Sequence, residues 1–151
     1  MTAVRKLFLI PAVAVLLLPA ACASLKPPRM HVEKIKLEKA RVTGLGMEVH
    51  FSIQNPNPEP LFIQRFEYEL KLNGYRLGRG YYPDALDLRS FTRESVVSHF
   101  ELNWLSLPGS VRSVLEGDRA KAEVRGTFYR RTGGGLKKLR FRSHAEVRLR
   151  E

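Results

Sequence analysis

Cysteine is nearly absent from the sequence, because Cys22 is the single one among 151 residues. The chain can therefore form no internal disulfide. The paired cysteines of zinc ribbons and thiol oxidoreductases are excluded for the same reason. Since no pairing is possible, the position of this thiol near the start of the chain becomes its informative property.

Motifs of catalysis are also missing. The sequence has no Gly-x-Ser-x-Gly, no His-Glu-x-x-His and no glycine-rich phosphate loop in front of a helix. The glycine run at 133–135 lies between two predicted strands, so we interpret it as a hairpin loop. The histidines are scattered, without a cysteine or carboxylate at metal-ligand spacing: His31, His50, His99 and His144. We expect no enzymatic activity, no cofactor and no metal site.

A long hydrophobic run is missing as well. The run Leu7 to Leu18 has 12 residues and contains Pro11, whereas a membrane-spanning helix needs about 20 apolar residues. Arg5 and Lys6 precede this run, and small residues follow it at 20–24. A basic start, an apolar middle and a small-residue end are typical of a secretory signal. The sequence therefore predicts an exported protein.

The residues in front of Cys22 resemble the bacterial lipoprotein signal, in which small residues separate an aliphatic residue from the cysteine that receives lipid. Two alanines precede the cysteine as in this pattern, and Pro19 stands where the pattern has leucine. The resemblance implies a lipoprotein signal peptide over residues 1–21, lipid attachment at Cys22 and a membrane anchor. The alternative is ordinary signal cleavage after Ala23 at a small-x-small site.

The same resemblance implies a location for the protein. Several acyl chains on Cys22 would hold it in a bilayer, since each buried CH₂ contributes about 0.8 kcal/mol. Ala23 follows the cysteine, and the absence of aspartate there implies the outer membrane of a bacterial cell envelope, facing the periplasm. Residues 22–31 contain two adjacent prolines and are predicted to form a short stiff tether to a single domain at 32–151.

The clearest strand signal lies between Met47 and Gln54. Apolar and polar residues alternate there, so a strand would bury one face and expose the other. The strand must stop at Asn55-Pro56-Asn57-Pro58, because prolines lack the N–H that a β-ladder needs and asparagine favours turns. We interpret this segment as a structural turn that fixes strand register. A binding site is the alternative.

Further alternating segments predict more strands. Phe66–Leu72 is followed at once by Asn73-Gly74, the strongest short hairpin signal, because both residues tolerate positive φ. Ser106–Gly117 is the single predicted helix, with Ser106 as its cap. Other strands are predicted at 32–42, 75–77, 86–91, 96–104, 120–128 and 139–149, with a loop at 81–88. The fold predicted is all-β, an antiparallel immunoglobulin/fibronectin-III-like β-sandwich of about seven strands with one short helix.

The stretch from Met47 to about Leu107 resembles the late embryogenesis abundant type 2 family, also called the water stress and hypersensitive response domain. The resemblance is carried by the alternating strand, by the Asn-Pro-Asn turn with Pro60-Leu61 behind it, and by Phe66–Leu72 with its hairpin continuation. It implies a single sandwich domain without known catalytic residues. It also implies an association with desiccation and other water stress, in which members protect proteins or bind partners.

Positive charge exceeds negative charge: 26 Lys and Arg against 15 Asp and Glu give a formal net charge of +11. In the last predicted strand, arginines occupy the even positions opposite apolar odd ones and share an exposed face: Arg140, Arg142, Arg148 and Arg150. Three interpretations compete for this face. It attracts anionic lipid headgroups or surface polysaccharide, binds an acidic protein partner, or is a solvated surface that keeps the domain soluble.

The sequence thus predicts a lipid-anchored, non-catalytic protein of the cell envelope with a stress-related binding or protective module. The alternative function is a structural or assembly component of the envelope that docks on anionic lipid or an acidic partner through its basic C-terminal strand. Export makes nucleic-acid binding unexpected despite the charge. We expect a monomer.

Overall fold

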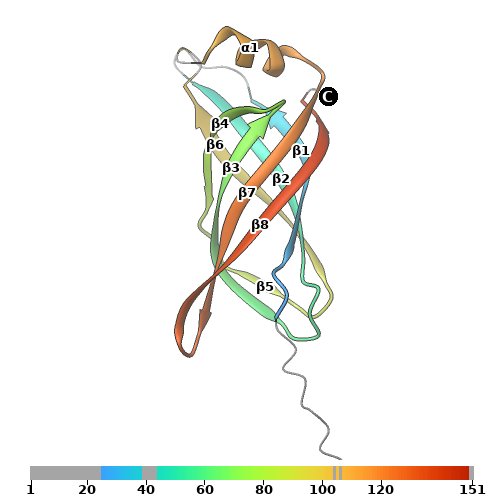
Figure 1. The fold of residues 1–151 in the computed structure, drawn as a ribbon, viewed down its shortest axis with the longest axis vertical. Helices are drawn as coiled ribbons and strands as arrows, with labels where there is room; N and C mark the ends of the chain where they lie inside the picture. The colour runs from blue at the N-terminus through green and yellow to red at the C-terminus, as the bar shows by residue number, and fades with distance from the viewer. Residues whose placement is uncertain (1–24, 39–43, 104, 106, 150–151) are drawn as a thin grey trace, which may run out of the picture.

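A computed structural model describes residues 25–38, 44–103, 105 and 107–149. The chain folds into two antiparallel sheets packed face to face (Figure 1). The helix α1 (Gly109–Glu116) lies across one end of the sandwich, next to the C-terminus, and β1 (Arg29–Leu37) begins at the opposite end. The predicted all-β sandwich with one short helix is confirmed.

The smaller sheet has three strands in the order β1-β2-β6. Its central strand is β2 (Leu45–Gln54), which pairs with β1 on one side and with β6 (Arg93–Leu102) on the other. The inward residues of β2 are the predicted ones, all at most 1% exposed: Met47, Val49, Phe51 and Ile53. Ser52, on the face predicted to be wet, is buried too.

The larger sheet has five strands, in the order β4-β3-β7-β8 with β5 also paired to β3. Their bounds are Leu61–Leu72 for β3, Tyr75–Tyr82 for β4, Leu86–Leu88 for β5, Arg119–Thr132 for β7 and Gly135–Arg148 for β8. Thr132 pairs with Gly135, so the two long strands β7 and β8 are joined by a tight hairpin turn. Along the sides of the sandwich, β1 contacts β8 and β4 contacts β6.

Aromatic rings from both sheets meet in the core between them. Phe66 contacts Phe51 and Phe128 edge to face, with ring centroids 5.7 and 5.6 Å apart. Tyr68 reaches across the core from β3 to β6, where its hydroxyl donates a hydrogen bond to Ser98 Oγ at 2.9 Å. Burial raises the pKa of Tyr68 to about 12, against a smaller opposing effect of that bond. The bond also explains why β6 carries a serine at an inward position.

The first strand differs from its prediction. It begins at Arg29, which pairs with Gln54, so the sheet includes the last three residues of the segment predicted as a tether. Pro28 directly precedes the strand, where a missing N–H costs no ladder bond. The strand ends at Leu37, Glu38 follows it without strand structure, and the remaining part of the predicted segment, 39–42, lies outside the described residues.

The next two differences lie in β3 and after β4. β3 begins at Leu61 rather than Phe66, and a bulge between Ile63 and Arg65 switches its inward positions from odd to even. This switch hid the first half of the strand from a search for simple alternation. The loop predicted at 81–88 is shorter and covers 83–85, because β4 runs to Tyr82. The strand predicted at 86–91 begins at Leu86 as β5 but ends at Leu88.

The helix is shorter than predicted. It begins after Pro108, whose carbonyl accepts the N–H of Val111 at 3.0 Å, and no side chain of the described residues caps it. Ser106, the predicted cap, lies outside the described residues. Gly117 ends the helix as predicted, and its buried side chains are Val111 and Leu115. Within the described ranges, the chain contains no helix long and apolar enough to span a membrane.

Candidate functional site: an asparagine turn and a basic groove

The Asn-Pro-Asn turn between β2 and β3 is a buried hydrogen-bond network. Asn55 is 0% exposed and Asn57 is 5% exposed. The side-chain amide of Asn55 donates to the carbonyl oxygens of Glu59, Leu88 and Arg89 at 2.8, 3.0 and 3.2 Å. Its Oδ1 accepts both the backbone N–H and the side-chain amide of Asn57, each at 3.0 Å. One buried side chain thus connects the turn to the loop after β5.

The second asparagine ties the turn to the segment in front of β1. The side chain of Asn57 accepts the backbone N–H of Lys26 at 2.9 Å and donates to its carbonyl at 2.8 Å. Nearby, Phe91 N–H donates to the carbonyl of Asn57, and the Ser90 hydroxyl donates to the carbonyl of Pro58. Because the side-chain amides are buried and bonded within the chain, these contacts favour a structural turn over a binding site.

Asn73-Gly74 forms a two-residue hairpin turn between β3 and β4. Their φ angles are 49° and 86°, as a type I′ turn requires, and Leu72 pairs with Tyr75 across it. The turn is also held against β7. Asn73 Oδ1 accepts the N–H of Lys121, and Asn73 N–H donates to the carbonyl of Lys121, both at 2.8 Å. This motif is therefore part of the packing between strands.

The arginines of β8 do not form one continuous stripe. Arg140, Arg142 and Arg148 are all exposed, and Arg150 lies outside the described residues. A histidine and a glutamate stand on the same face between Arg142 and Arg148, which are about 20 Å apart along the strand at ~3.3 Å per residue. Arg140 and Arg142 therefore form one site, and Arg148 belongs to the end of the sheet near α1.

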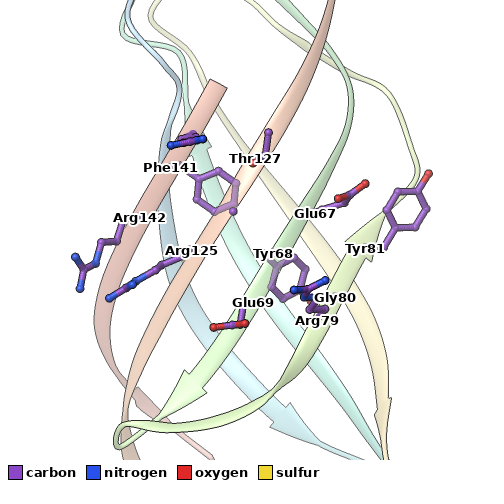
Figure 2. Close-up of a pocket in the computed structure, with 12 residues that line it drawn as sticks. Glu67, Tyr68, Glu69, Arg79, Gly80, Tyr81, Arg125, Thr127, Phe141 and Arg142 are labelled. Atoms are coloured by element: carbon purple, nitrogen blue, oxygen red, sulfur yellow. The ribbon is translucent and has the colours of Figure 1, made fainter. Parts of the chain in front are cut away.

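Arg140 and Arg142 line a shallow groove of about 760 Å³ across the outer face of the larger sheet (Figure 2). Its two walls are rows of residues paired across the ladders. The rows are Tyr81–Glu67–Thr127–Arg140 and Arg79–Glu69–Arg125–Arg142. Between them lies the row Gly80–Tyr68–Gly126–Phe141, which belongs to the inward phase, so its backbone forms the floor. Four different strands build the groove.

The groove carries more positive than negative charge. Glu123, just beyond it, accepts hydrogen bonds from Arg125 at 2.5 Å and Arg142 at 3.0 Å. Desolvation alone would raise the pKa of Glu123, but the bond from Arg125 and the charges of both arginines outweigh it and lower that pKa. Within the described residues, Arg79 and Arg140 make no ion pair. The groove therefore contains two guanidinium groups that pair with no carboxylate of the described residues.

Two of the four histidines lie close to a carboxylate. His50 and His99 both approach Glu48, with nitrogen-to-oxygen distances of 3.2 and 3.5 Å. Glu38, Glu48 and His99 each offer one metal-ligand atom, and these three atoms lie within 4.8 Å of one another. The other two histidines, His31 and His144, are exposed. Because the cluster joins β2, β6 and the end of β1, sequence spacing contained no signal for it.

A comparison with protein families decides what kind of domain this is. The family described as "Late embryogenesis abundant protein" matches residues 50–146, which reach from β2 into β8. The chain belongs to the late embryogenesis abundant protein family. The match extends well past Leu107, so α1, β7 and most of β8 are part of the late embryogenesis abundant domain.

One of the similar solved structures supports the same fold. The solution structure of a protein from Arabidopsis thaliana has a TM-score of 0.65 at 15% identity, covering 89% of this chain and 90% of that one. A crystal structure of a protein from Archaeoglobus fulgidus has a TM-score of 0.48 at 16% identity, covering 76% and 94%. A solution structure described as a late embryogenesis abundant protein has 0.49 at 16% identity, covering 87% and 76%. No curated protein matches the sequence.

Proposed function

We propose that the protein is a lipid-anchored, non-catalytic protein of the bacterial cell envelope whose late embryogenesis abundant domain is a protective or binding module. The family supports the module, since this domain is linked to protection under stress and desiccation and is usually non-catalytic. Cys22 behind an export signal supports the anchor. From Ala23 we propose the outer membrane, facing the periplasm, as the location.

The main structural support for the proposal is the position at which the N-terminal segment enters the domain. Lys26 is bonded to Asn57 at the end of the sandwich opposite α1, the end where β1 begins in Figure 1. Cys22 lies four residues before Lys26, a reach of about 14 Å for a fully extended chain. A lipid on Cys22 would therefore hold this end of the sandwich close to a bilayer.

The anchor is tested by growing cells with radioactive palmitate and comparing the wild-type chain with Cys22→Ala. We expect label on the wild type and none on the variant, because the thiol is the proposed attachment atom. Ser24→Ala, two residues further on, serves as the control and should be labelled like the wild type. Mass spectrometry of the mature N-terminus separates the two cleavage alternatives, before Cys22 or after Ala23. Equal labelling of wild type and Cys22→Ala would refute the anchor.

A specific surface favours a second function, docking on anionic lipid. We define the tether end as residues 26–29, 55–62, 86–92 and 130–138, which lie at the end of the sandwich where β1 begins. It holds seven basic residues against two acidic ones. The basic residues are Lys26, Arg29, Arg89, Arg130, Arg131, Lys137 and Lys138. Arg140 and Arg142 extend this surface along β8, because they line a hollow together with residues 26–30.

The tether end also exposes large apolar side chains. Phe62, Phe91 and Leu136 are 48%, 64% and 45% exposed. Phe91 has φ 56°, a conformation uncommon for a bulky residue, and its N–H is held by the carbonyl of Asn57. Basic groups beside exposed aromatic and aliphatic groups suit the interface of an anionic bilayer. This surface would lie against the membrane to which Cys22 is attached.

Docking is tested by reversing charge at the tip of the β7–β8 hairpin. The triple variant Arg131→Glu, Lys137→Glu, Lys138→Glu should bind vesicles containing phosphatidylglycerol about 100-fold more weakly, since each basic group contributes about 1 kcal/mol near such a surface. Co-sedimentation of the full-length protein is measured, with phosphatidylcholine vesicles as the reference. The difference between the two vesicle types removes any contribution of the apolar N-terminal segment.

The same two strands offer a matched control at their other end. The triple variant Arg119→Glu, Lys121→Glu, Arg148→Glu changes the charge equally, on exposed side chains remote from the tether end. It should keep most of the binding. Equal loss in both triple variants would mean that net charge alone is responsible, and equal binding to both vesicle types would remove anionic docking altogether.

A further inference from the structure

The outer face of the smaller sheet gathers carboxylate and imidazole groups around Glu48. This residue lies on the central strand β2, and its ladder neighbours are Lys36 on β1 and His99 on β6. His50 follows two positions along β2, on the same face. Glu38 comes directly after β1, and its backbone N–H donates to the carbonyl of Gly46 at 2.9 Å. Three strands therefore deliver these groups to one place.

The spacing of the groups suits a single metal ion. The ligand atoms of Glu38, Glu48 and His99 lie within 4.8 Å of one another. His99 Nε2 is 3.5 Å from Glu48 Oε1. Two ligand atoms that each lie ~2.05 Å from a tetrahedral zinc ion are about 3.3 Å apart. The imidazole and carboxylate are thus already near the separation that a shared ion requires.

A glycine makes room for the third group. A Cβ atom at position 46 would overlap the carboxylate of Glu38, which lies over the backbone of β2 at this point. Gly46 pairs with Glu101 on β6, so a further acidic residue occupies the neighbouring register position. The absence of a side chain at Gly46 is what allows the Glu38 carboxylate to lie across the strand toward Glu48 and His99.

We propose that Glu38, Glu48 and His99 bind a divalent transition-metal ion of the zinc type. A mixed imidazole and carboxylate set favours such an ion over Mg²⁺ or Ca²⁺, which prefer oxygen ligands alone. His50 is a positioning residue, since its Nε2 lies 3.2 Å from the second oxygen of Glu48 and orients that carboxylate. His99 is 64% exposed, so the ion reaches the site from solvent. Lys36 faces the same carboxylate and partly neutralises it.

Metal binding at this site should also stabilise the smaller sheet. An ion held by these three residues would link β2, β6 and the end of β1, in addition to the ladder hydrogen bonds that join these strands. Metal binding to the folded state stabilises that state by mass action. We therefore expect Zn²⁺ to raise the melting temperature of the protein in addition to giving a binding isotherm.

The test is a calorimetric titration of chelator-treated full-length protein with ZnCl₂. We expect one ion per chain for the wild type and none with MgCl₂. His99→Ala and Glu48→Gln should each weaken Zn²⁺ binding at least about 10-fold, since loss of an outer-shell partner alone already costs about that much. His144→Ala is the matched control, an exposed histidine on the other sheet, and should bind like the wild type. Cys22→Ala should also bind normally, which excludes the thiol as the ligand.

Two results would overturn the proposal: no saturable Zn²⁺ binding by the wild type, or the same affinity in His99→Ala as in the wild type. Circular dichroism checks that the variants are folded. If Glu48→Gln does not fold, the Zn²⁺ affinity of His99→Ala relative to the wild type decides the test. His99 is exposed, so its replacement by alanine should leave the fold unchanged.

Discussion

Replacing Asn55 with alanine is expected to lower the free energy of unfolding by about 3–4 kcal/mol. The change removes three donor bonds to the carbonyls of Glu59, Leu88 and Arg89, and two acceptor bonds from Asn57. The site is fully buried, so water cannot replace these partners. The main cost is the desolvation of polar atoms that the alanine variant leaves unpaired.

Urea denaturation of the full-length protein, followed by circular dichroism, measures this loss. Gln54→Ala is the control, since this neighbouring polar side chain is half-buried and makes no hydrogen bond within the described residues. It should change the unfolding free energy by less than about 0.5 kcal/mol. A loss below about 1 kcal/mol in Asn55→Ala would mean that the buried network contributes no more than a typical single hydrogen bond.

The same network connects stability to the proposed anchor. Asn57, which Asn55 holds in place, is the residue that binds both backbone groups of Lys26. If lipid is attached at Cys22, any pull from the membrane reaches the domain through this contact. With the proposed anchor, a structural turn would matter for function without binding a ligand, because it would fix which end of the sandwich faces the bilayer.

Local sequence patterns were sufficient for the fold class and for much of the core. Alternation from Met47 to Ile53 predicts the buried face of β2, because side-chain direction along a strand follows from position alone. Asn73-Gly74 predicts the hairpin turn for a similar reason. The turn needs two consecutive residues with positive φ, and asparagine and glycine are the residues that adopt it most readily. Both features are determined by residues that are close neighbours in the sequence.

Features that depend on pairing between distant strands could not be predicted in this way. The groove walls require the register of four strands, and that register is shifted by the bulge at Ile63 to Arg65. Glu48 meets His99 because β2 pairs with β6, although the two residues are 51 positions apart in the sequence. Arg148 is an example in which alternation groups residues that the structure separates. Alternation predicts that Arg142 and Arg148 share a face of β8, but their separation of six positions places the two side chains at different sites.

Gly126→Ala is expected to lower the free energy of unfolding by about 2–3 kcal/mol, the usual cost of adding volume to a packed site. Gly126 lies on β7 in the floor of the groove, paired with Tyr68 on one side and Phe141 on the other. A Cβ atom there would overlap the backbone carbonyl oxygen of Glu67 and the ring of Phe141. The carbonyl cannot move away without breaking the ladder between β3 and β7.

Gly78→Ala provides the comparison that isolates this overlap. Gly78 also lies in a strand of the larger sheet, but the nearest atom to an added Cβ is Cε2 of Phe100 at 3.8 Å, an ordinary contact. Alanine in place of glycine also reduces the entropy of the unfolded chain, so this variant should be neutral or slightly stabilised. Thermal and urea unfolding of both variants measure the difference. If Gly126→Ala proved as stable as Gly78→Ala, the close approach of β3 and Phe141 to β7 would not be the reason for the glycine at position 126.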